Sequence, residues 1–524
     1  MSLTPDFNTF SQLATRHPNC LIPVMRSFIA DDLTPVGAYR RMPESPYAFL
    51  LESVERGDRI GRYSFVGSAP EMILRGSVLP TPGYTIEHPG GALTHHSGDP
   101  LAALERYILD HPSIPRSEVE EVPPFAGGAV GYLGYDVIRL IEPRLMAHAP
   151  STPGIPGIPD LLVPIYRTIL AFDHVRKTAT VVHYASPKDF KTPQAAYDSA
   201  TENIEKVVHC LRQPAAELLA ELVPLPKTGS EVPVNSNVDR ERYMRSVEKA
   251  KEYIGAGDIT QVVPSQRLSR KTRAHPFEVY RSLRTINPSP YMFYLRFGDL
   301  HLVGSSPEVL VRVQDGLITV RPIAGTRRRG DNAIEDAQLA RELLSDPKER
   351  AEHVMLLDLG RNDVGRVAEF NTVRIDEQMI IENYSHVMHI VSNVSGRMRK
   401  GLNAFDVLRA CIPAGTVSGS PKIRAMEIID ELEPDRRGPY AGAAGVIDFL
   451  GNLNLAIAIR TFVMRECLDG TYDASVQAGG GVVADSVPQL EYEETLNKAR
   501  ALLRALAAAE ARMDAQPGRT SGQG

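Results

Sequence analysis

Hydrophobic and polar positions follow different patterns in the two halves of this chain. Up to residue 211, short apolar or alternating runs are separated by glycine and proline, which predicts many short β-strands. From residue 239 onward, similar runs are mixed with segments whose apolar residues recur every three or four positions, which predicts helices. Strands and helices do not alternate regularly, as they would in βαβ units. The pattern therefore predicts an α+β fold.

The stretch between the halves, residues 212–238, is rich in proline, alanine and polar residues and is predicted to be a linker. The expected organisation is an N-terminal region, 1–211, this linker, a second region, 239–510, and a flexible tail, 511–524. A chain of 524 residues is long enough for two domains or for one large composite core.

Two predicted helices each carry a pair of glutamates three residues apart, Glu349 with Glu352 and Glu491 with Glu494. This spacing places both members on one helical face, where like charges cost about 0.2–0.5 kcal/mol per exposed pair. Each pair can be explained as solvated surface, and Lys498 lies four residues after Glu494. Two such helices could instead bring four carboxylates around a hard cation such as magnesium, which takes oxygen ligands. Spacing alone leaves both interpretations open.

The first of these helices has recognisable end signals. Asp346 is the expected N-cap, Pro347 fits the opening turn, and Gly360 is the expected stop. The second helix is expected to begin after Ser486 and Pro488.

Composition describes an ordinary globular protein, with 23% charged and 43% hydrophobic residues. A net charge of −6 argues against a nucleic-acid-binding surface. The four cysteines lie far apart and form no CxxC motif, which argues against a disulfide framework or a zinc site. The N-terminus lacks the order of a signal peptide, and no apolar run has transmembrane length. We therefore expect a cytoplasmic protein without a membrane partner.

Four further segments carry candidate chemistry. The glycines 479–481 could expose amides to an anion or form only a tight turn. The basic run after Thr326 could steer an anionic substrate or be solvated. His386 and His389 could be structural, although histidine is also the commonest general base near neutral pH. Thr416, in a polar turn before a helix, could cap that helix or contact a ligand.

The chain resembles the chorismate-utilising enzyme family in a series of long, colinear motifs: "GSSPE", "RPIAGT", "DPKERAEHVMLLDLGRNDVGR", "YSHVMHIVS", "PAGTVSGSPKIRAMEII", "RRGPYAGAAGV" and "QAGGGVVADSVPQLEYEETLNKA". The resemblance is strong over 239–506 and looser before it. It implies that 239–510 is the chorismate-binding catalytic region and that 1–211 is a regulatory or structural region. It implies a large composite β-sandwich of mainly antiparallel sheets flanked by helices. It also implies a metal site for Mg²⁺, in which Glu349 and Glu491 bind the ion directly and Glu352 and Glu494 hold its waters. The ion would ligate the ring carboxylate of chorismate.

The same resemblance implies the remaining roles. Glu308 would be the general acid for the ring hydroxyl that leaves, with Thr416 near that hydroxyl, and His389 would be the general base. Tyr440 and Arg460 would hold the enolpyruvyl carboxylate, for which the arginine fork is well suited. The residues implied for catalysis are Glu308, His389, Thr416 and Gln261, and those implied for substrate binding are Gly325, Thr326, Tyr440, Arg460, Gly479, Gly480 and Gly481.

Two positions favour one reaction within the family. Gln261 stands where similar isochorismate-forming members carry a water-activating lysine, and Ala324 stands where many members that aminate carbon 4 carry a lysine. The resemblance therefore implies that chorismate and ammonia give anthranilate and pyruvate. No glutaminase triad is recognisable, so a separate glutamine amidotransferase subunit is expected to supply the ammonia.

Two stretches from different halves resemble the tryptophan-binding elements of family members under feedback inhibition. They are "LLES" and "NPSPYMFY", and the implied ligand residues are Glu52, Ser53, Pro290, Tyr291 and Met292. Two alternatives remain open. One is another aminating enzyme that makes aminodeoxychorismate or 2-amino-2-deoxyisochorismate, and the other is a non-catalytic amino-acid-sensing subunit.

Overall fold

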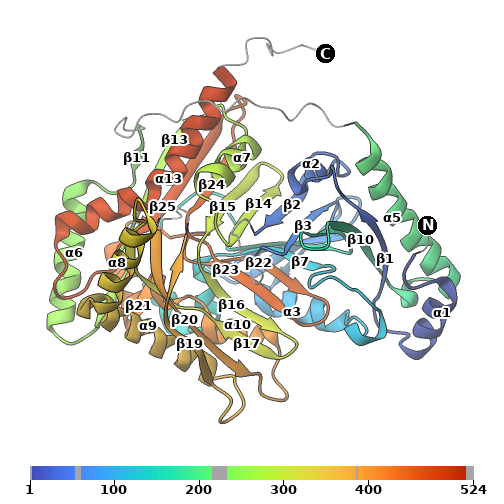
Figure 1. Cartoon of the computed structure of the whole chain (residues 1–524), viewed down its shortest axis with the longest axis horizontal. Coiled ribbons are helices and arrows are strands. Elements are labelled where there is room, and N and C mark those ends of the chain that lie inside the picture. Colours follow the sequence, from blue (N-terminus) through green and yellow to red (C-terminus); the bar gives the residue numbers. More distant parts are fainter. Residues whose placement is uncertain (1–2, 54–60, 153, 215–232, 385–386, 515–524) are drawn as a thin grey trace.

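The computed structural model describes residues 3–53, 61–152, 154–214, 233–384 and 387–514. Their strands form two large sheets, and helices cover the outside (Figure 1). No helix among these residues is long and apolar enough to cross a membrane.

The first sheet has eleven strands in the described residues. In spatial order they are β1 (Ile22–Ile29), β10 (Thr178–Ala185), β9 (Thr168–Asp173), β3 (Tyr63–Ser68), β2 (Tyr47–Glu52), β14 (Tyr291–Phe297), β15 (Leu300–Ser306), β24 (Thr461–Glu466), β25 (Tyr472–Gly479), β13 (Ser265–Thr272) and β11 (Asn235–Ser236).

The second sheet has twelve strands in the described residues. Eleven follow one another in space along a main path, and the twelfth, β19 (Arg374–Asn383), pairs with β20 (Val387–Arg397) beside them. The main path runs through β18 (Ile323–Arg328), β20 (Val387–Arg397), β17 (Leu317–Val320), β16 (Val309–Gln314), β23 (Leu453–Ile457), β22 (Ala443–Asp448), β7 (Gly128–Leu133), β8 (Leu161–Tyr166), β4 (Met72–Ser77), β5 (Gly83–Glu87) and β6 (Leu93–Ser97). A separate short pair joins β12 (Gln261–Val262) to β21 (Gly419–Ser420).

The two sheets pack on one hydrophobic core that contains residues from both halves of the chain. Across this core the ring of Phe49 on β2 lies 4.8 Å from that of Tyr166 on β8, and the ring of Tyr132 on β7 lies 5.9 Å from that of Phe297 on β14. The strand pairs are antiparallel, so the predicted α+β sandwich is confirmed.

Both sheets also join the two halves edge to edge. Strand β2 pairs with β14 through partners such as Glu52 and Met292, and β7 pairs with β22. The halves therefore share one composite core, while most of the predicted linker lies outside the described residues. The division into regulatory and catalytic regions stays a prediction.

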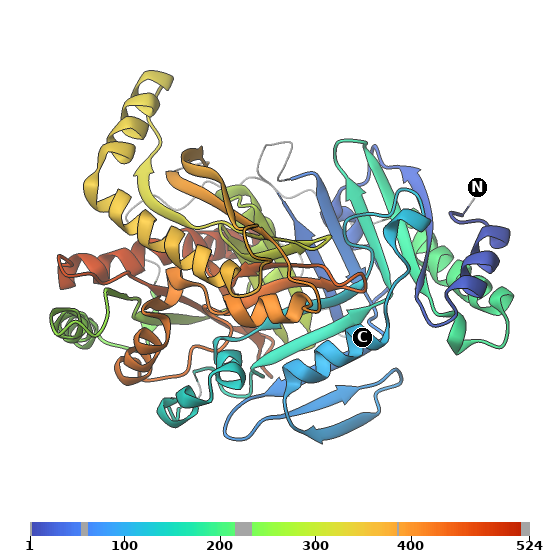
Figure 2. The same cartoon turned by 90° about the horizontal axis from the view of Figure 1, so that it is seen from below.

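The helices pack around the sandwich (Figures 1 and 2). They are α1 (Phe7–Arg16), α2 (Pro35–Tyr39), α3 (Pro100–Asp110), α4 (Ile138–Ile141), α5 (Pro193–Arg212), α6 (Arg240–Gly255), α7 (Pro276–Ile286), α8 (Ala333–Ser345), α9 (Pro347–Gly365), α10 (Ala404–Cys411), α11 (Gly415–Ser418), α12 (Lys422–Leu432) and α13 (Pro488–Asp514). Helix α9 packs on β18 and β20, and α13 packs on α6, α7 and β25.

The helix that carries the first acid pair begins as predicted but ends later. The Asp346 carboxylate accepts hydrogen bonds from the backbone N–H groups of Lys348 and Glu349, which confirms the cap. Gly360 does not stop the helix, which continues to Gly365. A Cβ atom on Gly360 would lie 3.2 Å from Cγ2 of Val320, so glycine serves close packing against β17 there. Similarly, α13 runs to Asp514, so 511–514 are helical instead of a frayed tail.

Candidate active site

The first acid pair projects from the opening turns of α9. Glu349 Oε1 accepts a 2.9 Å hydrogen bond from Arg327 Nη1, and Glu352 Oε1 accepts a longer one, 3.4 Å, from Gln261 Nε2. Gln261 is buried, and its own Oε1 has no hydrogen-bond partner among the described residues. An amide at this position can orient a carboxylate or a ligand, but it cannot act as a base.

The second acid pair projects from the opening turns of α13. Glu491 is buried, and its Oε1 accepts a 2.6 Å hydrogen bond from the Ser486 hydroxyl. Its Oε2 is buried without a hydrogen-bond partner in the described chain. Glu494 Oε1 accepts a 2.6 Å bond from Lys498 Nζ, so the ion pair suggested by their spacing does form. A buried carboxylate oxygen without a donor is costly, and it marks a position where a cation or a ligand fits.

The carboxylates of the two helices act on one another. Burial, followed by the charges of Glu349 and Glu494, raises the pKa of Glu352. Burial also raises the pKa of Glu491, and Glu494 adds to that effect. No group of three or more His, Cys, Asp or Glu side chains in the described residues is arranged to hold a metal ion by itself. Burial and mutual repulsion of these carboxylates are the features of the site that a bound cation would relieve.

Glycines line the space beside these acids because a side chain would collide there. A Cβ atom on Gly480 would lie 2.8 Å from Glu491 Oε2, and one on Gly481 would lie 2.7 Å from Gln261 Nε2. At Gly479 the Cβ atom would lie 2.8 Å from the Tyr440 hydroxyl. Gly325 has a φ of 66° at a bulge in β18, and its Cβ atom would lie 3.1 Å from Glu349 Oε2. Gly480 and Gly325 thus bring backbone close to the acids, and Gly479 and Gly481 bring it close to Tyr440 and Gln261.

Glu308 follows β15 and is buried. Burial raises the pKa of its carboxyl group to about 8, against the opposing effects of the Thr416 hydroxyl and the Lys498 charge. The Thr416 hydroxyl donates a 2.9 Å hydrogen bond to Glu308 Oε1. Thr416 therefore does not cap a helix, because it lies inside α11. At neutral pH Glu308 is a protonated acid that can donate its proton.

His389 lies on β20, and its ring is held on one side. Its Nδ1 lies 2.8 Å from the carbonyl oxygen of Gly325 and 3.1 Å from the Thr326 hydroxyl. A carbonyl only accepts, so Nδ1 carries the proton and Nε2 keeps a free lone pair. Burial lowers the pKa of His389, and the Arg460 charge lowers it further. This histidine is therefore neutral at pH 7 and able to accept a proton.

Arg460 and Tyr440 lie next to the glycines. Arg460 Nη1 donates a 3.1 Å hydrogen bond to the backbone oxygen of Lys498, and the φ of Arg460 is 50°, which is rare for a residue with a side chain. Burial raises the pKa of Tyr440 to about 12, so its hydroxyl remains a hydrogen-bond donor. The two side chains supply a guanidinium and a phenol suited to a carboxylate ligand.

The structure adds two cations to the predicted site. Lys498 Nζ donates to the Gly479 oxygen at 2.8 Å as well as to Glu494, and its charge opposes the rise in the pKa of both Glu308 and Glu352. Arg327 binds Asp346 and Glu349, so it is ion-paired instead of solvated. Lys498 has one sequence signal: it lies four and seven residues after the acids of α13, on the same helical face. His386, the other candidate histidine, lies outside the described residues.

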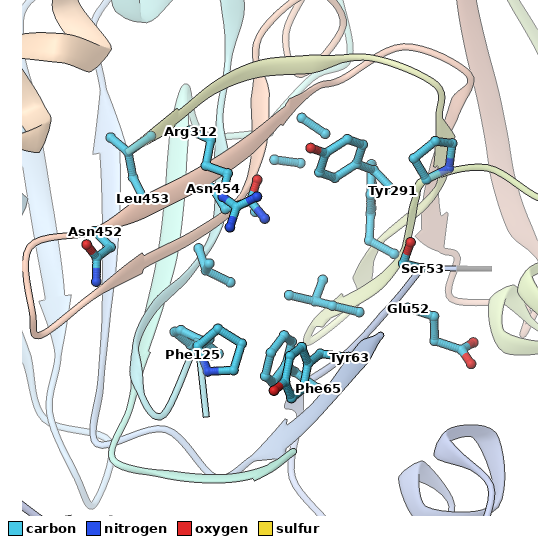
Figure 3. A pocket seen from close by; sticks show the side chains of 18 of the residues that line it. Glu52, Ser53, Tyr63, Phe65, Phe125, Tyr291, Arg312, Asn452, Leu453 and Asn454 are labelled. Atoms are coloured by element: carbon cyan, nitrogen blue, oxygen red, sulfur yellow. The ribbon is translucent and has the colours of Figure 1, made fainter. Parts of the chain in front are cut away.

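Away from the acid pairs, a cavity of about 230 Å³ lies where β2 and β14 meet (Figure 3). It brings together Ser53, Pro290, Tyr291 and Met292 from the two halves. Figure 3 shows Phe65 and Phe125 on one side of it and Tyr291 and Arg312 on the opposite side. The Ser53 hydroxyl oxygen is buried without a hydrogen-bond partner in the described residues. The cavity wall therefore carries several aromatic rings, the Arg312 side chain and an unsatisfied polar group at Ser53.

Glu52 also lines this cavity, but its carboxylate points away from it (Figure 3). The carboxylate accepts a 2.6 Å hydrogen bond from the Tyr280 hydroxyl and contacts Arg284 Nε at 2.7 Å. Both partners belong to α7, the helix that packs on α13. Glu52 thus ties the cavity wall to α7, whose Glu278 backbone oxygen accepts a 3.2 Å hydrogen bond from Arg512 near the C-terminal end of α13.

Known proteins resemble this chain over most of its length. A family model described as chorismate binding enzyme matches residues 81–504. Anthranilate synthase component 1 of Synechocystis sp. is 49% identical over 516 residues, which cover 97% of this chain and 99% of that relative. Anthranilate synthase component 1 of Pseudomonas aeruginosa is 47% identical over 93% of this chain and 96% of its own length.

Solved structures show the same fold. Anthranilate synthase component I from Streptococcus pneumoniae matches 91% of this chain and 99% of its own, with a TM-score of 0.72 and 36% identity. The menaquinone-specific isochorismate synthase from Escherichia coli matches with a TM-score of 0.66, but at 17% identity it supports the fold alone.

Proposed function

The chain belongs to the chorismate binding enzyme family, among the anthranilate synthase component 1 relatives, and we propose that it aminates chorismate with ammonia to give anthranilate and pyruvate. The observation that carries this proposal is the opposed protonation of two groups, the buried Glu308 and the partly buried His389. The pKa of Glu308 is raised to about 8, so its carboxyl group is protonated at pH 7. His389 is neutral at that pH, and the lone pair on its Nε2 can accept a proton. Such a pair suits a reaction that needs a proton donor first and a proton acceptor afterwards.

The first step joins ammonia to ring carbon 2 while the hydroxyl on carbon 4 leaves. Glu308 donates a proton to that hydroxyl, so that it departs as water, and the Thr416 hydroxyl holds the Glu308 carboxyl in place. The added nitrogen, which carries three hydrogens after it bonds to carbon 2, gives up one proton and becomes an amine, so one proton is consumed and one is released in this step. In the second step His389 removes the proton from carbon 2, and the enolpyruvyl group leaves the ring and becomes pyruvate once it has gained a proton. The ring is then aromatic.

Substrate positioning is proposed for the groups around this acid and base. Arg460 and Tyr440 hold the enolpyruvyl carboxylate, and the backbone of Gly325, Gly479, Gly480 and Gly481 lies close enough to contact the ligand. Thr326 contacts His389 and supports its orientation. Ala324 and Gln261 offer no lysine for addition to the ring or for activation of water, which favours amination at carbon 2.

Magnesium is the proposed cofactor. When bound, it would ligate the ring carboxylate of chorismate and offset the mutual repulsion of the four glutamates. The unpartnered Glu491 Oε2 and the raised pKa of Glu352 support a cation between α9 and α13. Glu349 and Glu491 are proposed to bind the ion directly, and Glu352 and Glu494 to hold its waters.

Two further proposals concern partners. A separate glutamine amidotransferase subunit supplies ammonia, in keeping with the component 1 name of the relatives. Tryptophan is proposed to bind in the cavity between β2 and β14, where Ser53 and backbone groups meet its charged ends. Pro290, Tyr291 and Met292 cover its indole. Ordering this cavity acts on α13 through the Glu52 contacts with α7.

Nitrogen-source dependence tests the proposal. The purified chain is supplied with chorismate and magnesium, and with either an ammonium salt or glutamine. We expect anthranilate fluorescence with ammonium and none with glutamine. Turnover of glutamine by the isolated chain would contradict the separate subunit, and loss of chorismate without anthranilate would favour one of the other aminating reactions.

A further inference from the structure

Arg437 and Glu433 form an ion pair at the end of α12, and their side chains are only 1% and 5% exposed. Arg437 Nε lies 2.9 Å from Glu433 Oε2 and Nη2 lies 2.6 Å from Oε1, so the contact is bidentate. Burial opposes the guanidinium charge, but the Glu433 carboxylate keeps the pKa of Arg437 above its ordinary value. Arg437 therefore keeps its positive charge inside the protein.

The remaining donors of Arg437 reach backbone segments that carry site residues. Nη1 donates a 2.7 Å hydrogen bond to the oxygen of Val417, which follows Thr416. Nη2 donates a 2.6 Å bond to the oxygen of Val263, two residues after Gln261. The guanidinium also lies over the Tyr440 ring, 5.4 Å from its centroid. One side chain thus contacts three separate parts of the substrate site.

Glu433 connects Arg437 to strand β25, which ends at Gly479. Its Oε1 accepts 2.8 Å hydrogen bonds from both the backbone N–H and the hydroxyl of Ser265. Ser265 on β13 pairs with Gly479 on β25. The Ser265 hydroxyl accepts a 2.8 Å hydrogen bond from Gln477 Nε2, also on β25. The ion pair therefore links Gly479 to the segments that hold Thr416, Gln261 and Tyr440.

These contacts are specific to a planar, forked cation. Lysine has a single nitrogen with three donors and cannot reach two carbonyls and both carboxylate oxygens together. Neither member of the pair has been given a role in the reaction, and neither contacts the four metal-site glutamates. A buried ion pair is weak evidence for stability, so a role in geometry is the better explanation of its cost.

We propose that Arg437, held by Glu433, is a positioning residue that sets the spacing between the acid-supporting Thr416 and the carboxylate-binding Tyr440. This inference rests on the proposed function of those two residues. If the pair is disturbed, chorismate binds less tightly and the proton reaches its leaving hydroxyl less often. Magnesium binding to α9 and α13 is unaffected.

The matched control is Arg139, which is equally buried, with 1% of its side chain exposed. It is also held by a carboxylate of α12, with Nη2 at 2.7 Å from Asp430 Oδ1, but it contacts none of the site residues. Arg139→Lys therefore reports the general cost of replacing a buried arginine beside this helix, and Arg437→Lys adds any effect on positioning.

The test compares wild type, Arg437→Lys, Glu433→Gln and Arg139→Lys. We expect kcat/KM for chorismate to fall by about tenfold or more in Arg437→Lys and Glu433→Gln relative to Arg139→Lys, with the half-saturating magnesium concentration changed by less than about twofold. Calorimetric binding of chorismate, which needs no turnover, and thermal unfolding are measured in parallel. If a variant were partly unfolded, its half-saturating magnesium concentration would rise, because magnesium is expected to bind only the folded protein. An unchanged value therefore separates a positioning effect from a general loss of folding.

Equal losses in Arg437→Lys and Arg139→Lys, after correction for the folded fraction, would overturn the proposal, because the pair would then be merely structural. Wild-type kinetics in Arg437→Lys would overturn it as well. If Arg437→Lys does not fold, Glu433→Gln decides, since it removes one charge and keeps the shape of the side chain. A wild-type enzyme that binds chorismate but makes no anthranilate would count against the proposed function alone, and chorismate binding by the variants would still test the positioning role.

Discussion

Replacing Glu308 by glutamine removes the proposed proton donor while keeping its shape. The Thr416 hydroxyl can still donate to the Oε1 of glutamine, so the local structure is expected to persist. We expect kcat with ammonia to fall by about 10²–10⁴-fold, the usual contribution of a general acid. A free glutamate with a pKa of 4.5 would be almost fully ionised at pH 7, so burial supplies this acid.

The raised pKa of Glu308 sets the expected pH dependence. With a pKa of about 8, about nine-tenths of the carboxyl groups are protonated at pH 7 and about one-tenth at pH 9. In the free enzyme kcat/KM should therefore fall about tenfold per pH unit above pH 8. The folded state holds this proton more tightly than the unfolded state, so the unfolding free energy of wild type decreases between about pH 4.5 and pH 8. Glu308→Gln lacks this loss and should be at least as stable as wild type at pH 8.

The assay is initial-rate anthranilate fluorescence at a constant concentration of free ammonia, because ammonium itself loses its proton in this pH range. Thermal unfolding of both proteins at pH 6 and pH 8 is the control for folding. A Glu308→Gln enzyme with near-wild-type kcat would refute the assignment. A wild-type kcat/KM that stays flat from pH 7 to pH 9 would refute the argument from burial.

Four other outcomes are expected. Glu491→Gln should abolish turnover without lowering the unfolding temperature, because it relieves repulsion while weakening cation binding; near-wild-type activity at limiting magnesium would exclude the four-acid site. His389→Ala should accumulate the aminated, non-aromatic intermediate, detected by chromatography, and finding only unreacted chorismate would place the block in the first step. Thr416→Val should move the alkaline limb of kcat/KM to higher pH, because the Thr416 hydroxyl lowers the pKa of Glu308 in wild type and its removal raises that pKa. An unmoved limb would contradict an effect of the Thr416–Glu308 hydrogen bond on the pKa. Ser53→Phe should keep catalysis but resist tryptophan, and unchanged inhibition would exclude the cavity between β2 and β14.

Features encoded by short stretches were predictable from the sequence. The α+β class, the cap at Asp346 and the shared helical face of each acid pair follow from apolar periodicity and helix geometry. The motifs also indicated candidate glutamates, glycines and a histidine for the site. The structure then gave Glu308 and His389 their protonation states, because these depend on burial by residues distant in the sequence.

Features that depend on tertiary packing were not predictable. Gly360 carries a stop signal, yet α9 continues because the glycine packs against Val320. The carboxylate of Glu52 is turned toward Arg284, which is 232 residues away along the chain, and no local pattern indicates that contact. Likewise, the spacing of Arg437 and Glu433 suggests only an ordinary helical ion pair, and their links to Val263 and Val417 appear only in the fold.

Identification of the product tests the central claim most directly. The purified chain is incubated with chorismate, magnesium and ¹⁵N-labelled ammonium, and the products are separated and identified by mass spectrometry. The account predicts labelled anthranilate and pyruvate in equal amounts. Labelled aminodeoxychorismate, a stable 2-amino-2-deoxyisochorismate as the only product, or unreacted chorismate would contradict it.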